Sequence, residues 1–413
     1  MKRSHVVGAG IVGLATALYL QEKGRAVSMF DPLPPGEGTS SGNAGIISTG
    51  SLFPEAEPGI WKQFPGMILD PLAPVCVRPG SLPGLLPWLL RFLSRSSQQK
   101  FESGTRSIAP LSTRALEFLD PLVKKAEAET LLRREGIIYV YAEVGQFQKA
   151  QTRCQLRDRL GSDYRIVEGR ELRDLLPCLR DGLAGGIVIP SAAFTVSPLA
   201  LSRKLFDLFK SQGGEYLQGE VSGFDTVGQS CKAIKANGDS HPGDEIFITA
   251  GAYSGALARQ LGSKVPLVTE RGYHLMLPNP ELTVDGSLIL VEKGLAVTPM
   301  LDGLRLAGTV ELAALDEPAN YKRAWKLAQY AEELLPGLNT EGGEPWMGYR
   351  PSVPDSVPVI SRSPNYDNVF YGFGHGHLGL TQAAITGAML AAMAEGVNPP
   401  EPGHSYRIDR SWW

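Results

Sequence analysis

Hydrophobic and polar positions along this chain predict alternating strands and helices at both of its ends. Residues 5–7 form a short apolar run typical of a buried strand, an apolar helical stripe continues to about residue 24, and residues 26–31 fit a second strand. The C-terminal part repeats this order, with a strand at 368–371, a glycine-rich turn and a helix over 380–394. We therefore expect one α/β domain assembled from distant parts of the chain.

The middle of the chain contains apolar residues at both helical and strand spacing. Ser197 and Pro198 are good helix-starting residues before the apolar stripe of 199–211, and Asn237-Gly238 is a typical hairpin turn. The other expected elements are a loop over 32–58, helices over 112–132 and 146–160, strands over 136–141 and 245–249, and a mixed region over 265–345.

A glycine pattern lies between the first strand and the first helix. Gly8 permits a tight turn, Gly10 lets the backbone approach a pyrophosphate, and Gly13 lets the helix pack on the strand. Asp31 ends the second strand, where a carboxylate accepts hydrogen bonds from a ribose. Strand, helix and acidic residue in this order predict a dinucleotide site at the helix N-terminus.

Composition narrows the function further. A chain of 413 residues is long enough for two domains, and a formal net charge of −3 gives no reason to expect a nucleic-acid partner. The four cysteines, at positions 76, 154, 178 and 231, include no C-x-x-C pair, so we expect neither a disulfide framework nor a metal site. Lys2 and Arg3 before an apolar run resemble a secretory signal, but cleavage there would destroy the glycine motif. We expect a cytoplasmic protein with no later segment that spans a bilayer.

Three further segments carry a family resemblance, and all occur in the family's order. They are Ser40-Ser41-Gly42-Asn43-Ala44-Gly45-Ile46-Ile47-Ser48, the G-x-R-P-x-x-P-D-x-x-P-x-I pattern of 348–360, and the glycine-rich turn of 372–381. Together they resemble the D-amino acid oxidase and dehydrogenase superfamily of FAD-dependent oxidoreductases over essentially the whole chain. The second glycine-rich segment is what favours FAD over NAD.

The resemblance implies a fold with two domains. A Rossmann-like FAD-binding domain would comprise 1–50, 197–264 and 346–413, and an α+β substrate domain with a large mixed or antiparallel sheet would comprise 51–196 and 265–345. The cofactor residues that it implies are Gly8, Gly10, Ile11, Val12, Gly13, Asp31, Ser40, Ser41, Asn43, Ala44, Gly45, Ile46, Val221, Ala250, Gly251, Gly374, His375, Gly376, His377, Leu378, Gly379, Leu380 and Thr381.

Arg350 is the strongest substrate candidate. A guanidinium binds a carboxylate through two parallel hydrogen bonds, and the resemblance places this arginine over the flavin; a structural ion pair with Asp355 is the alternative. His274 and Tyr273 would contact the substrate or close its pocket, although a structural role for His274 is equally expected. Within the flavin turn, His375 and His377 would tune the cofactor rather than act as bases.

The implied reaction needs no protein acid or base. In this family the Cα hydrogen of a neutral amine passes as hydride to flavin N5. A cysteine tether near the C-terminal motif is excluded because no cysteine follows Cys231, so FAD would bind noncovalently. The expected substrate is a D-amino acid or a cyclic or N-substituted imino acid such as D-proline or D-hydroxyproline, with a quinone or partner protein as electron acceptor. The alternatives are an oxygen-using glycine or sarcosine type oxidase, and a noncatalytic flavin relay subunit.

The apolar segment 82–93 allows two interpretations. Its leucines, Trp88, Phe92 and Arg91 suit a short interfacial helix that would hold the protein at the cytoplasmic face of the inner membrane. A helix packed on the substrate domain is equally compatible with the pattern.

Overall fold

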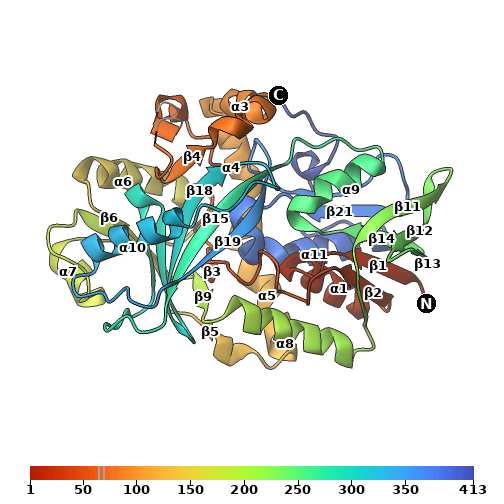
Figure 1. Ribbon diagram of the computed structural model, residues 1–413, viewed down its shortest axis with the longest axis horizontal. Coiled ribbons are helices and arrows are strands. Elements are labelled where there is room, and N and C mark those ends of the chain that lie inside the picture. The colour runs from red at the N-terminus through yellow and green to blue at the C-terminus, as the bar shows by residue number, and fades with distance from the viewer. Residues whose placement is uncertain (64–65, 68–69) are drawn as a thin grey trace.

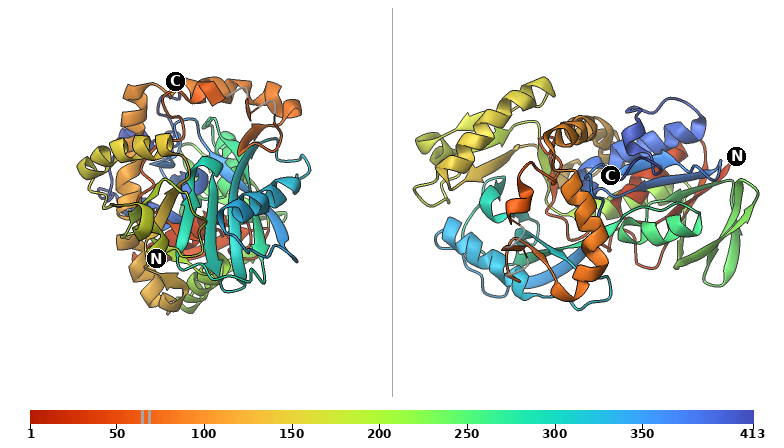
Figure 2. Two further views of the ribbon diagram at one scale, coloured as in Figure 1. Left: turned by 90° about the vertical axis from the view of Figure 1, so that its left-hand side faces the viewer. Right: turned by 90° about the horizontal axis from the view of Figure 1, so that it is seen from above.

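The computed structural model describes residues 1–63, 66–67 and 70–413 and shows two domains side by side (Figures 1 and 2). The first domain is built on a six-stranded sheet in the order β10-β2-β1-β14-β21-β20, in which only β20 is antiparallel to its neighbour. Its strands are β1 (Arg3–Val7), β2 (Ala26–Asp31), β10 (Glu215–Gln218), β14 (Glu245–Ile248), β20 (Val359–Arg362) and β21 (Val369–Phe373). Sequence order and spatial order differ, so this domain is discontinuous, as the repeated strand–helix pattern predicts.

Helices cover one face of this sheet. They are α1 (Ile11–Glu22), α4 (Gln98–Thr113), α5 (Ala115–Lys125), α8 (Pro198–Ser211) and α11 (Gly379–Glu395), whose apolar side chains form one core with the sheet. A Cβ at Gly387 would come within 2.7 Å of the Ala15 backbone, so α11 and α1 cross in close contact. On the other face lie α9 (Ser254–Gln260) and the sheet of β11 (Val221–Val227), β12 (Ser230–Ala236) and β13 (Asp239–Pro242).

A nine-stranded mixed sheet forms the second domain. Its order is β19-β15-β18-β17-β16-β6-β8-β7, with β4 paired to β18. The strands are β4 (Val75–Val77), β6 (Ile137–Tyr141), β7 (Arg165–Val167), β8 (Gly185–Ile189), β15 (Val268–Leu277), β16 (Ser287–Leu290), β17 (Leu295–Met300), β18 (Gly303–Leu312) and β19 (Glu344–Ser352). Helix α10 (Lys322–Leu334) packs on this sheet. Among the described residues the second domain also has α3 (Leu82–Ser94), α6 (Val144–Arg159) and α7 (Gly169–Leu175). A small separate sheet is formed by β3 (Ile46–Ile47), β9 (Ala193–Thr195) and β5 (Leu132–Arg133).

Several local predictions agree with this structure. The expected strand at 26–31 is β2, and the Ser197 hydroxyl accepts a hydrogen bond from the Ala200 N–H as the cap of α8. Asn237 and Gly238 both have positive φ, as the hairpin turn requires. The expected helix over 112–132 is wrong in extent, because Ser97 caps an earlier helix, α4, and Arg114 separates it from α5.

The expected domain boundaries need correction at two places. The boundary at 345/346 cuts β19, which is hydrogen-bonded to β15 in the large sheet. Helices α4 and α5, expected in the substrate domain with the rest of 51–196, pack instead in the core of the first domain. Their apolar faces find α11 as a partner, which no local pattern specifies.

One stretch is apolar and long enough to cross a membrane by composition, contrary to our expectation from the sequence. It covers 376–395, and 78% of its most apolar window is buried inside the protein. The stretch is therefore the core helix α11 with its preceding turn.

Candidate functional site

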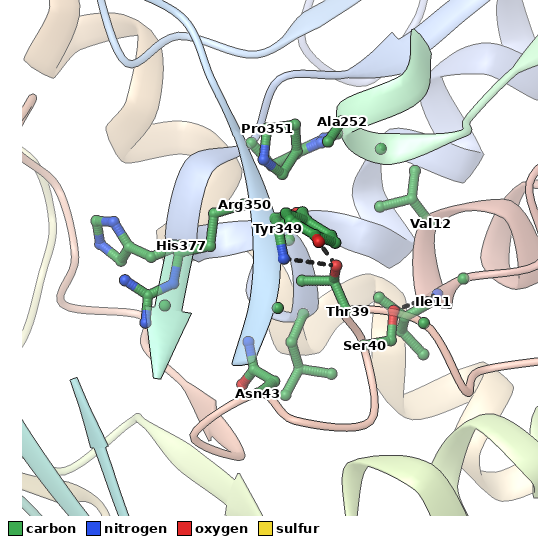
Figure 3. A pocket seen from close by; sticks show the side chains of 18 of the residues that line it. Ile11, Val12, Thr39, Ser40, Asn43, Ala252, Tyr349, Arg350, Pro351 and His377 are labelled. Atoms are coloured by element: carbon green, nitrogen blue, oxygen red, sulfur yellow. Dashed lines mark hydrogen bonds between the residues drawn. The ribbon is translucent and has the colours of Figure 1, made fainter. Parts of the chain in front are cut away.

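A cavity of about 1060 Å³ extends from the first domain to the large sheet of the second. Its lining combines the glycine turn after β1, the loop over 38–48, the turn before α11 and strands of the large sheet (Figure 3). The volume is at the upper end of the range for cofactor sites.

The glycine turn at one end of the cavity shows why each glycine is needed. Gly8 has φ +106, and a Cβ there would come within 2.6 Å of the Thr249 carbonyl oxygen. A Cβ at Gly13 would overlap the Gly8 carbonyl oxygen, so this glycine allows α1 to pack on the strand. Gly10 is the N-cap of α1 and borders the cavity, and the N-terminus of α1 therefore lies open to a ligand.

Asp31 and Ser40 organise this turn. The Asp31 carboxylate accepts hydrogen bonds from the N–H groups of Ala9 at 2.7 Å and Leu33 at 2.9 Å. Burial raises the pKa of Asp31, although these two hydrogen bonds oppose the shift. Ser40 Oγ accepts a hydrogen bond from the Ile11 N–H at 3.0 Å (Figure 3). Both side chains border the cavity and fix the start of α1.

The loop that includes Asn43 is held by a residue that the sequence did not single out. Arg305 Nη1 donates to the carbonyl oxygens of Ser41 at 3.0 Å and Asn43 at 2.7 Å. Burial lowers the pKa of Arg305 to about 10. Asn43 in turn accepts a hydrogen bond from the Gly45 N–H at 2.8 Å. The alternation of β18 could have indicated Arg305, but not which loop it holds.

The turn before α11 forms the second end of the cavity. Thr381 Oγ1 accepts a hydrogen bond from the Ser48 N–H at 3.0 Å, which joins the start of α11 to the 46–48 segment. His375 borders the cavity, and its Nε2 shares a 2.9 Å hydrogen bond with Thr386 of α11; burial lowers its pKa to about 3. His377 Nδ1 donates to Glu55 at 2.7 Å.

Most of the expected cofactor residues border this one cavity. They are Gly8, Gly10, Ile11, Val12, Asp31, Ser40, Asn43, Ala44, Ile46, Val221, Ala250, Gly251, His375, Gly376, His377, Leu378, Gly379, Leu380 and Thr381. Gly13, Ser41, Gly45 and Gly374 lie behind the lining. Each of these four supports the backbone of the lining rather than facing the cavity.

Arg350 lies at the boundary of the two domains and borders the cavity. Its guanidinium occupies the volume that a side chain at Gly272 would fill on the neighbouring strand. Arg350 Nη1 donates to the Thr309 carbonyl at 3.2 Å. The ion pair with Asp355 that the sequence left open does not form, because Asp355 binds Arg410 at 2.9 Å. Figure 3 shows the guanidinium turned toward His377.

A β-bulge presents the Thr309 carbonyl to Arg350. The register of β15 with β18 shifts between Arg271 and Tyr273, and Thr309 adopts φ +53 within this irregularity. Bulges re-aim backbone groups beside functional sites. The strand distortion thus contributes one fixed acceptor that orients the guanidinium.

Tyr273 and His274 take different positions relative to the cavity. Tyr273 borders the cavity, but its hydroxyl donates to Glu311 at 2.6 Å, and burial raises its pKa to about 12. His274 is outside the lining; its Nδ1–H donates to the Gly42 carbonyl at 2.9 Å, and burial lowers its pKa to about 3. The structural role is therefore the one that the geometry of His274 supports.

Trp346 is a cavity residue that sequence reasoning missed. Its indole stacks on His274 at 4.8 Å between ring centroids, and a Cβ at Gly42 or Gly348 would overlap its ring. Two glycines thus make room for one aromatic side chain. Glycine within a strand signals such a close approach, so Gly348 was the available sign.

The residues present fit FAD. The cavity is bounded by two glycine-rich turns, each followed by a helix N-terminus, and added Cβ atoms at Gly8 or Gly13 would distort the first turn. One turn suits a pyrophosphate, and the second suits the electron-rich end of a flavin. The fold and site therefore define a flavoprotein of the doubly wound type.

Comparison with known proteins gives the family. The model of the family "FAD dependent oxidoreductase" matches residues 5–393, and the chain belongs to this family. It is an FAD-dependent oxidoreductase, and the fold class and cofactor expected from the sequence are confirmed.

The chain is similar to a D-amino-acid oxidase of Bradyrhizobium diazoefficiens, 32% identical over 96% of each protein. A D-amino acid dehydrogenase of Vibrio vulnificus is 28% identical over 96% of this chain and 97% of that protein. Among solved structures, glycine oxidase from Geobacillus kaustophilus superposes with a TM-score of 0.78 at 19% identity, covering 100% of both chains. At this identity the superposition shows the shared fold alone.

Proposed function

We propose that this protein oxidises the C–N bond of a D-amino acid or of a cyclic or N-substituted imino acid such as D-proline or D-hydroxyproline. The carrying observation is the position of Arg350 at the cavity, over Gly272 and without an ion pair to Asp355, which binds Arg410 instead. Relatives named D-amino-acid oxidase and D-amino acid dehydrogenase support an amino-acid substrate.

Bound FAD supplies a hydride acceptor, and the residues of the chain position the substrate. Arg350 binds the α-carboxylate through its cavity-facing N–H groups, while the Thr309 carbonyl restrains the guanidinium. Trp346, rigid between Gly42 and Gly348, forms an apolar wall that limits the substrate side chain. This preorganisation fixes which hydrogen of the substrate faces the cofactor.

We further propose a quinone or a partner protein as electron acceptor, with peripheral contact at the cytoplasmic face of the inner membrane through α3. This helix buries Leu85, Trp88 and Leu89 against the second domain but leaves Leu86 and Leu90 about half exposed, at 50% and 51%. An apolar exposed edge suits an interface with lipid. An oxygen-using oxidase is the alternative for the same site.

The direct test is anaerobic bleaching of the flavin by a panel of D- and L-amino acids and imino acids. We expect bleaching by D- or cyclic substrates, and reoxidation by a quinone analogue faster than by oxygen. Rapid peroxide formation instead would assign the oxidase. A flavin that no amino or imino acid bleaches would contradict the proposed substrate class and favour a relay subunit.

A further inference from the structure

A second group of charged side chains lies beside Arg350 and has no part in carboxylate binding. Glu270 is paired with Arg350 across strands β15 and β19, and its side chain is 2% exposed. Glu55 comes from the loop after β3 and borders the cavity. Three elements distant in sequence therefore bring two carboxyl groups next to one guanidinium.

Glu55 is held in place from several sides. Its backbone N–H donates to Ser356 Oγ at 3.1 Å, and its carboxylate accepts from His377 Nδ1 at 2.7 Å. The carboxyl groups of Glu270 and Glu55 are close enough for each to shift the pKa of the other. Glu55 is thus held by hydrogen bonds although its side chain is 31% exposed, whereas Glu270 is buried.

Among the described residues, Glu270 Oε2 is buried and has no hydrogen-bond donor. Two ionised carboxylates cannot bond each other, because both only accept. A single proton between them satisfies the orphaned oxygen and removes one of two adjacent negative charges. One proton on the pair therefore accounts for the orphaned oxygen of Glu270.

The charges around the pair agree with this arrangement. Burial, followed by the charge of Glu55, raises the pKa of Glu270 to about 8. Burial alone would raise the pKa of Glu55 too, but the hydrogen bond and charge of His377 and the charge of Arg350 outweigh it and lower that pKa. Ser352 is the remaining polar group that faces Glu270. On the opposite side of the sheet, Arg271 and Glu311 pair with each other at 3.6 Å.

We propose that Glu55 and Glu270 share one proton beside Arg350, and that this pair accepts the ammonium proton of an amino-acid substrate. The inference rests on the proposed function, since it needs an α-amino acid as substrate. It assigns an acid–base role to two residues in a reaction that needs a neutral amine.

The charges balance in this step. Before binding, the singly protonated pair neutralises Arg350. A zwitterionic substrate then brings its carboxylate to Arg350, and one N–H bond of its ammonium breaks while an O–H bond forms on Glu55. The nitrogen keeps the electron pair, and no electron leaves the substrate. Afterwards the substrate carboxylate is the counter-ion of Arg350, and both carboxyl groups are neutral.

His377 gives the proton a route out. Its side chain is 45% exposed and contacts Glu55 directly. Once Glu55 is protonated, the tautomer of His377 that carries its proton on Nε2 accepts the Glu55 proton at Nδ1. The Nε2 proton then leaves to solvent, so that Glu55 is again ionised and Nδ1–H again donates to it. The pair is thereby reset after each turnover.

The test uses the FAD-loaded protein and propionate, the amine-free counterpart of alanine. Propionate brings a carboxylate but no proton, so its binding must take up about one proton from solution, and its Kd must weaken up to tenfold per pH unit above neutrality. Flavin absorbance reports binding, and a pH indicator in weak buffer reports the proton. An amino acid that reduces the flavin, in contrast, should release no proton when it binds.

Glu55→Gln should abolish the proton uptake, whereas Glu57→Gln, at a partly exposed glutamate two positions away that pairs with Arg153, should retain it. Equal uptake in wild type and Glu55→Gln, or proton release on amino-acid binding, would overturn the proposal. Infrared spectra of the resting wild-type protein provide a second test that needs no variant. A protonated-carboxyl band should be present at pH 7, diminish above pH 8 and be absent from Glu270→Gln; its absence from wild type would refute the shared proton. Neither measurement depends on turnover. Both results could therefore be interpreted even if no amino acid proved to be a substrate.

Discussion

The guanidinium of Arg350 lies across Gly272, in the volume that a side chain at position 272 would fill. The two residues lie on neighbouring strands, β19 and β15, two positions out of register, because Gly272 is opposite Gly348 and Arg350 is opposite Glu270. The glycine thus determines where the arginine can lie, and the pair joins the large sheet to the cofactor cavity.

Gly272→Ala should displace the guanidinium without unfolding the sheet, because the overlapping group is the end of a flexible side chain. We expect KM for the substrate to rise about tenfold, equivalent to about 1.4 kcal/mol. Steady-state kinetics and propionate binding would measure it. Gly223→Ala in β11 is the matched control, since its nearest neighbour would lie 3.7 Å from the new Cβ. An unchanged KM in Gly272→Ala would show that the position of Arg350 does not matter.

Arg350→Lys should weaken carboxylate binding by about tenfold to a hundredfold, because an ammonium replaces a planar fork and loses one charged hydrogen bond of about 1.5–3 kcal/mol. The Kd of propionate, followed by flavin absorbance, measures this directly. Arg203→Lys, in an exposed pair with Glu37, should change nothing. Equal affinity in Arg350→Lys and wild type would remove Arg350 from substrate binding.

Gly13→Ala should lower FAD retention and stability together, because the new Cβ overlaps the Gly8 carbonyl and separates α1 from β1. FAD content per chain and Tm are the measurements. Gly145→Ala, in helix α6 with open space around it, should leave FAD content unchanged and stabilise by about 0.5–1 kcal/mol. Full FAD occupancy in Gly13→Ala would contradict the close packing.

Acid should destabilise the protein through two buried histidines. Burial lowers the pKa of His274 and His375 to about 3, from the ordinary 6.5. Between pH 3 and pH 6.5 the unfolded chain binds more protons than the folded protein. The two neutral histidines therefore contribute fully to the free energy of unfolding above pH 6.5, and this contribution is lost as the pH falls toward 3. Denaturant unfolding across this range should show a shallower loss in His375→Asn than in wild type. The exposed His404→Gln should follow wild type; if His375→Asn does so as well, His375 does not carry the effect.

Leu86→Ser with Leu90→Ser should reduce binding to anionic lipid vesicles, because these side chains form the exposed edge of α3. Vesicle sedimentation measures it, and dye-linked activity should stay unchanged. Val144→Ser, on α6 with 61% exposure, controls for the loss of an exposed apolar side chain. Undiminished sedimentation of the double variant would remove α3 as a membrane contact.

Some residues of the candidate site could be predicted from the sequence and others could not, depending on whether the sequence signal for each is local. The sequence by itself determined the two glycine-rich turns, Asp31, the Ser197 cap and the FAD-dependent class, because turns, caps and phosphate cradles depend on contiguous residues. It also named Arg350, through a family resemblance. For Tyr273 and His274 the sequence left the role open, and on the same strand the residues beside Arg350 are Glu270 and Gly272, which it did not name.

Only the tertiary structure decided the rest. Contacts between residues up to 322 positions apart decide which strand lies beside β15 and that Asp355 pairs with Arg410. They also bring Glu55 to Glu270 and His377. Such contacts arise from burial shared by several elements, and no periodicity along one segment encodes the partner. The sequence therefore specified the cofactor cradle, and the packing of the two domains specified which charged residues lie around Arg350.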